Sequence, residues 1–137
     1  MSDDGKAVTI AWMFNEDTSG WFTYSLAVML RHDAQNGFHV NRPEGGFITI
    51  STGPRMAEAR NMCIDQYAAD HPSSDWLLFL DADMTFDPNL VEVMMQVADP
   101  EKVPILGGLC FAGGRGNEPW PTIWQELDGP KENFWNI

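Results

Sequence analysis

The stretch Asp75-Trp-Leu-Leu-Phe-Leu-Asp81-Ala-Asp83-Met-Thr-Phe-Asp87-Pro88 decides the fold of this chain. Its apolar run does not alternate, which is typical of a strand covered on both faces within a parallel sheet. Side chains two residues apart in an extended chain point the same way, so Asp81 and Asp83 are predicted to project together at the strand's carboxyl end, with Ala82 turned away. Open α/β sheets bind ligands at that end. Two adjacent carboxylates repel each other, and a divalent cation would make the pair favourable.

The composition fits one globular domain of 137 residues, with 44% hydrophobic residues and six tryptophans. The formal net charge of -12, from 20 acidic and 8 basic residues, makes nucleic acid and anionic membranes poor partners. No apolar run reaches the roughly 20 residues that a transmembrane helix needs, and the polar start does not resemble a signal peptide. Cys63 and Cys110 lie in apolar runs, so we expect buried thiols and a cytoplasmic protein.

Periodicity predicts alternating strands and helices. Strands are expected over residues 7–14, 47–51, 75–81 and 103–111, and helices over 21–34, 55–69 and 90–98. The first helix is apolar nearly all round and is expected to be covered, with Thr18 or Ser19 as its N-cap. Asp87 and Pro88 are predicted to occupy the N-cap and N1 positions of the last helix. This order predicts an α/β fold with a mainly parallel sheet and helices on both faces.

The second predicted helix carries an unusual charge. Met56, Ala59, Cys63, Ile64 and Tyr67 form one apolar stripe at about 100° per residue. Arg60 falls inside this stripe, so it is predicted to lie on the buried face. A charged residue there needs a partner, either Asp81, Asp83 or a bound phosphate, or else a structural ion pair.

A single domain is expected over residues 1–137, with a disordered tail at 1–6 and an irregular segment at 112–137. The segment after residue 112 lacks hydrophobic periodicity and is rich in glycine and proline. Because residues 136 and 137 follow no natural stop signal, we expect the chain to be the first half of a larger protein or a truncated product.

The residues also resemble a known family. Ala59-Arg60-Asn61, then a helix, then a hydrophobic strand ending Phe79-Leu80-Asp81-Ala82-Asp83, resembles the nucleotide-sugar half of GT-A-fold glycosyltransferases. The similarity is greatest to family 2-like enzymes, including short phage and bacterial members, and covers roughly residues 8–111. It implies a Rossmann-like nucleotide-diphospho-sugar transferase fold. It also implies metal-dependent transfer of a sugar from a nucleoside-diphosphate-sugar, such as a UDP- or GDP-sugar, to an acceptor that the sequence does not identify.

The resemblance also implies roles for individual residues. Asp83 resembles the DxD aspartate that binds Mn²⁺ or Mg²⁺ bridging the two phosphates of the donor. Asp81 resembles the aspartate that contacts the ribose or shares the metal. Arg60 matches the arginine that reaches the nucleotide or its diphosphate. Asn15 and Asp17 lie in the loop where such enzymes contact base and ribose.

The sequence departs from the family pattern in three places. The helix after Ala59-Arg60-Asn61 continues Met-Cys-Ile-Asp, where many members are glycine-rich. The segment 107–114 resembles the strand and loop facing the donor sugar and acceptor, but the family's catalytic base lies in a later acidic motif and is not assigned here. A later histidine often supplies a third metal ligand, and no histidine follows His71.

Other functions fit parts of the pattern. Asp81 to Thr85 matches the DxDxT phrase of haloacid dehalogenase-type phosphatases, in which Asp81 would be the nucleophile. That phrase normally follows the first strand, whereas two strand–helix units precede it here. A non-catalytic or incomplete sugar-nucleotide-binding domain is a second alternative. A nucleotidyltransferase is a third, although no glycine-rich phosphate loop follows the first strand. Both a monomer and a homo-oligomer remain open.

Overall fold

A computed structural model describes residues 5–51, 55–108, 110–112, 120–121, 124–125 and 132–133. The chain forms two compact units, residues 1–98 and 99–137, and each is considered by itself. The first unit holds Asp81 and Asp83 together with the strands and helices that precede them in the chain. Within the described residues, no helix is long and apolar enough to span a bilayer.

The first unit is built on a three-stranded parallel sheet with the order β2-β1-β3. Its strands are β1 (Val8–Phe14), β2 (Gly46–Ser51) and β3 (Trp76–Asp81). The central strand β1 is almost wholly buried, as its apolar sequence requires. Because all three strands run in one direction, their carboxyl ends share one edge of the sheet.

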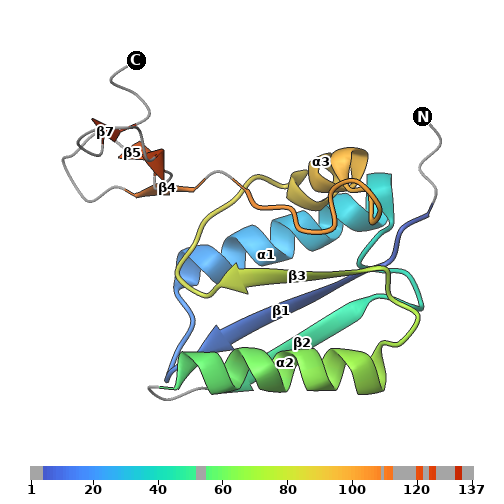
Figure 1. Cartoon of the computed structure of the whole chain (residues 1–137), viewed down its shortest axis with the longest axis horizontal. Coiled ribbons are helices and arrows are strands. Elements are labelled where there is room, and N and C mark those ends of the chain that lie inside the picture. The colour runs from blue at the N-terminus through green and yellow to red at the C-terminus, as the bar shows by residue number, and fades with distance from the viewer. Residues whose placement is uncertain are drawn as a thin grey trace. The chain divides into compact units, whose positions relative to one another are not determined.

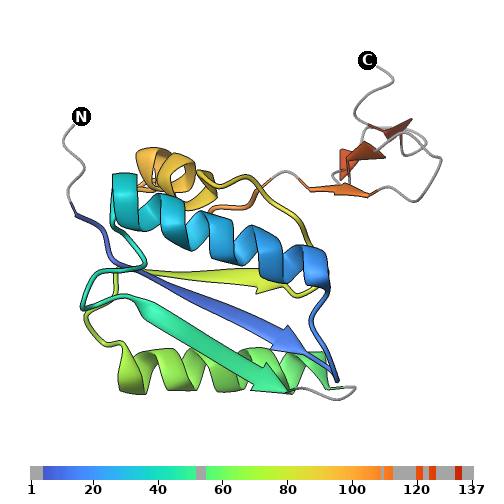
Figure 2. The ribbon, with the colours of Figure 1, turned by 180° about the vertical axis from the view of Figure 1, so that it is seen from behind.

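Helices cover both faces of this sheet. The helices α1 (Gly20–His32) and α3 (Leu90–Val97) lie on one face, and α2 (Met56–Asp70) lies on the other, as Figures 1 and 2 show from opposite sides. The predicted α/β fold with a parallel sheet between helices is therefore confirmed. The core between α2 and the sheet is an apolar cluster of Ala11, Met13, Ile48, Ala59 and Cys63.

The amino end of α1 matches the sequence prediction, but its exposure does not. Ser19 is the N-cap, and its hydroxyl oxygen accepts a hydrogen bond from the backbone N–H of Phe22 at 3.0 Å. Trp21 and Tyr24 are 74% and 66% exposed, so the expectation of a covered helix was wrong. A helix packed on a sheet buries one side, and the apolar residues on the other side of α1 face solvent.

The last helix of this unit begins at Leu90, as predicted, but without the predicted cap. It starts at Leu90 with Asn89 at the N-cap position and no side-chain capping bond, so the assignment of Asp87 as N-cap was wrong. Its carboxyl end is held by Lys6, which lies in the stretch expected to be a tail. The Lys6 ammonium donates to the carbonyl oxygens of Met95 at 3.0 Å and Ala98 at 2.5 Å. A cation at a helix carboxyl terminus satisfies carbonyls that lack helical partners.

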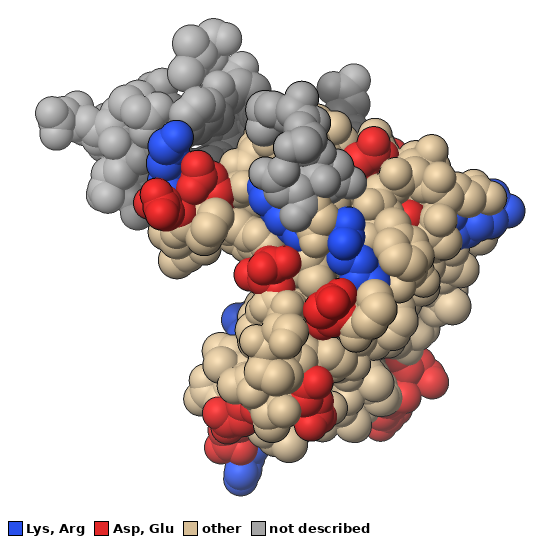
Figure 3. All heavy atoms as spheres, turned by 90° about the vertical axis from the view of Figure 1, so that its right-hand side faces the viewer, with Lys and Arg blue, Asp and Glu red and all other residues tan. Residues whose placement is uncertain are grey.

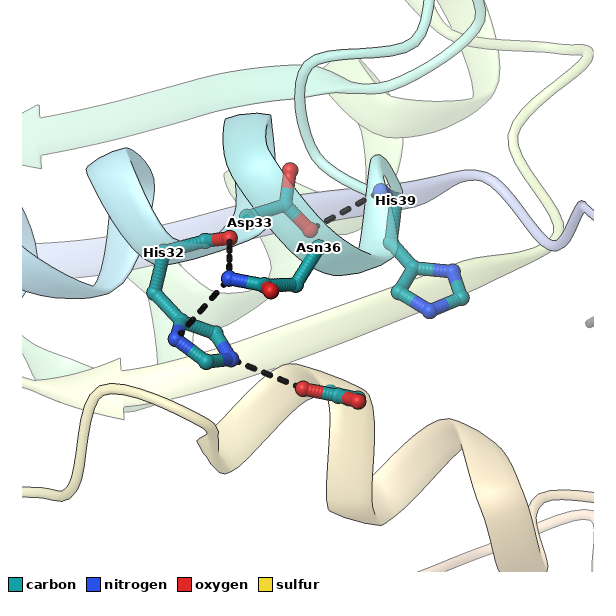
Figure 4. A network of polar contacts seen from close by, with 5 residues as sticks. His32, Asp33, Asn36 and His39 are labelled. Atoms are coloured by element: carbon teal, nitrogen blue, oxygen red, sulfur yellow. Dashed lines mark hydrogen bonds and ion pairs between the residues drawn. The ribbon is translucent and has the colours of Figure 1, made fainter.

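The amino end of the sheet is fastened by polar contacts around Asp33. This residue opens the π-helical turn η1 (Asp33–Gly37), and its side chain is buried. Its carboxylate accepts hydrogen bonds from the backbone N–H groups of His39 at 2.8 Å, Val40 at 3.0 Å and Asn41 at 3.0 Å. The Asn41 amide adds a fourth at 2.9 Å. Figure 4 shows Asp33 directed at the backbone of His39. This carboxylate therefore fixes the loop that leads into β2.

A second polar contact near Asp33 joins the two helices on the same face of the sheet. The Nε2 atom of His32 lies 2.7 Å from a carboxylate oxygen of Glu92, linking α1 to α3 (Figure 4). The Asn36 amide nitrogen lies 3.3 Å from Nδ1 of His32.

Figure 3 views the molecule from the side of the amino ends of the strands, where acidic and basic side chains are interspersed.

The second unit differs from the prediction of a fourth strand over residues 103–111. Val103 forms an isolated antiparallel bridge with Asp99, the described residues 104–108 are not a strand, and Ile105 is 90% exposed. Pro104 lacks a backbone donor, and Gly107-Gly108 weakens a strand, which explains the difference. Cys110 is half-buried rather than buried. Four two-residue strands form two antiparallel pairs: β4 (Phe111–Ala112) with β5 (Trp120–Pro121), and β6 (Trp124–Gln125) with β7 (Glu132–Asn133).

The predicted irregular segment at 112–137 and the predicted tail at 1–6 fall largely outside the described residues. Residues 52–54, between β2 and α2, also lie outside them. The prediction of a single domain stays a prediction.

Candidate functional site

A cavity of about 660 Å³ opens at the carboxyl edge of the sheet in the first unit. Its walls come from the ends of β1 and β3, the loop between β1 and α1, and the first turns of α2. The lining residues are Met13, Phe14, Asn15, Asp17, Thr18, Ser19, Met56, Arg60, Asp81, Ala82 and Asp83. All five residues singled out from the sequence as donor-binding candidates are therefore brought to one cavity.

The two aspartates reach this cavity by a different route from the predicted one. The strand β3 ends at Asp81, and Ala82 and Asp83 form a turn in which the N–H of Met84 donates to the carbonyl oxygen of Asp81 at 3.1 Å. The expectation that an extended chain aligns both side chains was therefore wrong. Ala82 also lines the cavity, so it is not turned away. The turn nevertheless leaves Asp81 and Asp83 on the wall of the same cavity.

Arg60 is exposed, so the prediction that it lies on the buried face of its helix was wrong. The helix α2 packs on β2 and β1 through Ala59 and Cys63. Met56, Arg60 and Ile64 follow one another at i, i+4 and i+8 along an edge of α2 that is exposed. The first two line the cavity, which places Arg60 around the same space as the ends of β1 and β3 and the chain that follows them.

Asn15 and Asp17 lie in the loop that follows β1, and both are exposed. The backbone carbonyl of Asn15 accepts a long hydrogen bond of 3.4 Å from the Ser51 hydroxyl at the end of β2. The loop then leads directly into the N-cap of α1. Both residues therefore stand just after the carboxyl end of β1, in the wall of the cavity.

Three charged side chains of the cavity have no partner within the described part of the protein. Among the described residues, the side chains of Arg60, Asp81 and Asp83 form no hydrogen bond or ion pair, so the predicted pairing of Arg60 with either aspartate is not present. Three aspartates and one arginine line the cavity, which gives it a formal charge of -2. A diphosphate would be repelled by these carboxylates unless a cation entered with it.

The donor atoms suit a hard divalent cation but do not enclose one. No group of three His, Cys, Asp or Glu side chains that could hold a metal ion exists among the described residues. Asp81 and Asp83 offer carboxylate oxygens, which Mg²⁺ and Mn²⁺ prefer. Magnesium usually binds through one or two carboxylates, with substrate phosphates and water completing its shell. The residues present therefore fit a metal that binds together with a phosphorylated ligand.

Several lining residues were missed by the sequence argument. Met13 and Phe14 end β1, and Met13 is paired in register with Asp81. The rule that parallel strands share one carboxyl edge was enough to find them. Thr18 and Ser19 were recognised as capping candidates, and their place in the wall follows from the same rule. Whether Met56 lines the cavity depends on the rotation of α2 about its axis, and the sequence carries no direct signal for that rotation.

The fold and the cavity define an α/β protein with an open cavity at the carboxyl edge of a parallel sheet. The model of glycosyl transferase family 2 matches residues 30–136, more than half of the chain. The chain therefore belongs to glycosyl transferase family 2, and the resemblance to GT-A enzymes of this family is confirmed. No curated protein and no solved structure gave a significant match. Arg60, Asp81 and Asp83 lie within the matched residues, whereas Asn15 and Asp17 precede them.

Proposed function

We propose that this protein binds a nucleoside-diphosphate-sugar together with Mn²⁺ or Mg²⁺ in the cavity at the carboxyl edge of its sheet, and transfers the sugar to an acceptor. Membership of glycosyl transferase family 2 supports glycosyl transfer in general. The observation that carries the finer proposal is the convergence of Asn15, Asp17, Arg60, Asp81 and Asp83 on one cavity.

The charge of the cavity supports the need for a cation. A divalent ion held by Asp81 and Asp83 would offset the formal charge of -2 and make a diphosphate acceptable. When bound, such an ion stabilises the charge that develops on a leaving phosphate oxygen, as a Lewis acid does. Asp81 and Asp83 are the residues that would hold it, because their carboxylate oxygens form no hydrogen bond or ion pair with the other described residues.

The remaining polar residues are proposed to bind the two ends of the donor nucleotide, its diphosphate and its nucleoside. Arg60 has a guanidinium group without a protein partner among the described residues, and guanidinium groups bind phosphate oxygens through paired hydrogen bonds. Asn15 and Asp17 lie on the β1 side of the cavity, where hydrogen bonds to a ribose or a base would fix the nucleoside.

A thermal-shift screen of UDP and GDP, each with and without Mn²⁺, tests donor binding first. A ligand that binds the folded state raises the melting temperature by mass action. We expect stabilisation by at least one of the two nucleotides when Mn²⁺ is present. A silent screen at millimolar concentrations would support a domain that does not bind sugar nucleotides.

Activity is then measured as release of nucleoside diphosphate from UDP- and GDP-sugars. Replacing Arg60 with alanine removes a charge-assisted contact, so we expect donor affinity to fall by about tenfold or more. Arg31→Ala is the matched control, because Arg31 is exposed on α1 and does not line the cavity. Hydrolysis of p-nitrophenyl phosphate that disappears in Asp81→Asn, with no release from sugar nucleotides, would instead establish the phosphatase.

A further inference from the structure

We propose that the amino end of α1 positions the Asp81–Asp83 turn, and that the backbone N–H of Ser19 is the main positioning contact. This inference rests on the proposed function. It adds that the loop after β1 and the turn after β3, which are more than sixty residues apart in sequence, form one rigid wall of the cavity.

Ser19 serves two elements at once. Its hydroxyl oxygen caps α1 by accepting from the N–H of Phe22 at 3.0 Å. Its own backbone N–H donates to the carbonyl oxygen of Ala82 at 3.1 Å. Ala82 stands between the two aspartates, so this bond holds the centre of the turn that carries both carboxylates. A backbone bond at this distance has ordinary geometry and is not weakened by side-chain freedom.

Two further contacts fasten the chain just after the turn to the same helix. The ring of Phe86 packs edge-on against the ring of Phe22, with centroids 6.0 Å apart. The N–H of Phe86 donates a long hydrogen bond of 3.4 Å to the hydroxyl oxygen of Ser25, which is buried. The segment from Ala82 to Phe86 is therefore attached to α1 at its beginning and at its end.

These attachments matter because the aspartates have no side-chain partners of their own among the described residues. A carboxylate on an exposed turn is oriented only as well as its backbone is held. Preorganised ligands bind a metal more tightly because less freedom is lost on binding. The contacts of α1 thus supply the order that Asp81 and Asp83 do not obtain from side-chain hydrogen bonds.

The test compares Ser19→Pro with Ser19→Ala. Both variants lose the hydroxyl group, so its contribution to the cap and to the cavity cancels between them. Ser19→Ala keeps the backbone N–H, whereas Ser19→Pro removes it. The native φ of Ser19 is -66°, which proline adopts without strain. The Cδ atom of proline also takes the place of the hydrogen that points at the Ala82 carbonyl oxygen, so Ser19→Pro removes the bond and displaces the turn that carries both aspartates.

For both variants, the dissociation constants of UDP and GDP are measured in the presence of Mn²⁺, and the melting temperatures are measured without ligand. We expect Ser19→Pro to bind the nucleotide about fivefold more weakly than Ser19→Ala in the presence of Mn²⁺, as for the loss of one hydrogen bond. We expect uridine and guanosine, measured without Mn²⁺, to bind the two variants equally, because the proposed function assigns the nucleoside to Asn15 and Asp17 and the metal to Asp81 and Asp83. A purely structural role of this bond would change the melting temperature but would leave the Mn²⁺-dependent affinity for the nucleotide unchanged.

Equal Mn²⁺-dependent affinities of the two variants would overturn the positioning role while leaving the proposed function intact. Absence of nucleotide binding in the unsubstituted protein would instead overturn the proposed function. If Ser19→Pro does not fold, Ser25→Ala is compared with Ser25→Thr, which keeps the hydroxyl group. We then expect about twofold weaker Mn²⁺-dependent binding in Ser25→Ala, recovered in Ser25→Thr, and equal affinities would overturn the proposal.

Discussion

The two ends of the parallel sheet use the same side chain in opposite ways. At the amino end, the carboxylate of Asp33 is buried and accepts four hydrogen bonds from residues 39–41. At the carboxyl end, Asp81 and Asp83 are exposed and accept no side-chain hydrogen bond from any described residue. A buried carboxylate has to be satisfied within the fold, whereas an exposed pair is available to a ligand.

Within one unit of 98 residues, the amino end of the sheet therefore contributes to stability and the carboxyl end offers groups for binding. The amino end holds the loop into β2 and the end of α3 by hydrogen bonds to the backbone. The carboxyl end keeps three aspartates and one arginine around a cavity. Substitutions at the amino end should therefore destabilise the fold, and substitutions at the carboxyl end should weaken or abolish binding while the fold survives.

The largest expected effect is that of Asp33→Asn on stability. The amide nitrogen of the new side chain would replace an oxygen that faces backbone N–H donors, which leaves buried donors unsatisfied. We expect a loss of about 3 kcal/mol in the free energy of unfolding. Urea denaturation followed by circular dichroism measures it. Asp81→Asn is the matched control and should change stability by no more than about 0.5 kcal/mol. Equal losses in the two variants would break the comparison.

A smaller effect is expected for Lys6→Met. The methionine keeps the apolar stem but removes the ammonium that donates to Met95 and Ala98 at the end of α3. We expect a loss of about 1 kcal/mol, measured in the same urea experiment. Lys102→Met serves as control, because the Lys102 side chain is 82% exposed. If both variants lose the same amount, the contacts of Lys6 do not hold α3.

The smallest expected effect concerns pH and the core below the cavity. Burial raises the pKa of the Cys63 thiol above its ordinary value of 9.0. The folded state therefore keeps this proton when the unfolded state has lost it. Its contribution to stability is complete below the unfolded pKa and is lost as pH rises through the folded pKa. We expect the unfolding free energy to fall more steeply above about pH 9 in the unsubstituted protein than in Cys63→Ala. Parallel curves would contradict the assignment.

Much of the fold follows from local patterns in the sequence. The strands β1, β2 and β3 and the helices between them were predicted from hydrophobic periodicity, and the N-cap at Ser19 from residue type. The cavity followed from one rule, because the carboxyl ends of parallel strands collect the residues after β1 and β3 at one edge.

The failures at Arg60 and Trp21 share one physical cause, which is that position within a helix does not reveal what the helix packs against. Arg60 lies within an apolar stripe, yet α2 meets the sheet through Ala59 and Cys63, which leaves Arg60 exposed. Trp21 lies on the solvent side of α1 for the same reason. The role of Asp33 was not predicted, since its backbone partners are chosen by the tertiary fold.

The central claim is that Asp81 and Asp83 bind a diphosphate through a divalent cation. Titration calorimetry of UDP and GDP, with and without Mn²⁺, tests it most directly in the unsubstituted protein, Asp83→Ala and the control Asp65→Ala. Asp65 is exposed on α2 and does not line the cavity. We predict binding that requires Mn²⁺, disappears in Asp83→Ala and persists in Asp65→Ala. Binding of equal strength without metal, or in Asp83→Ala, would contradict the account.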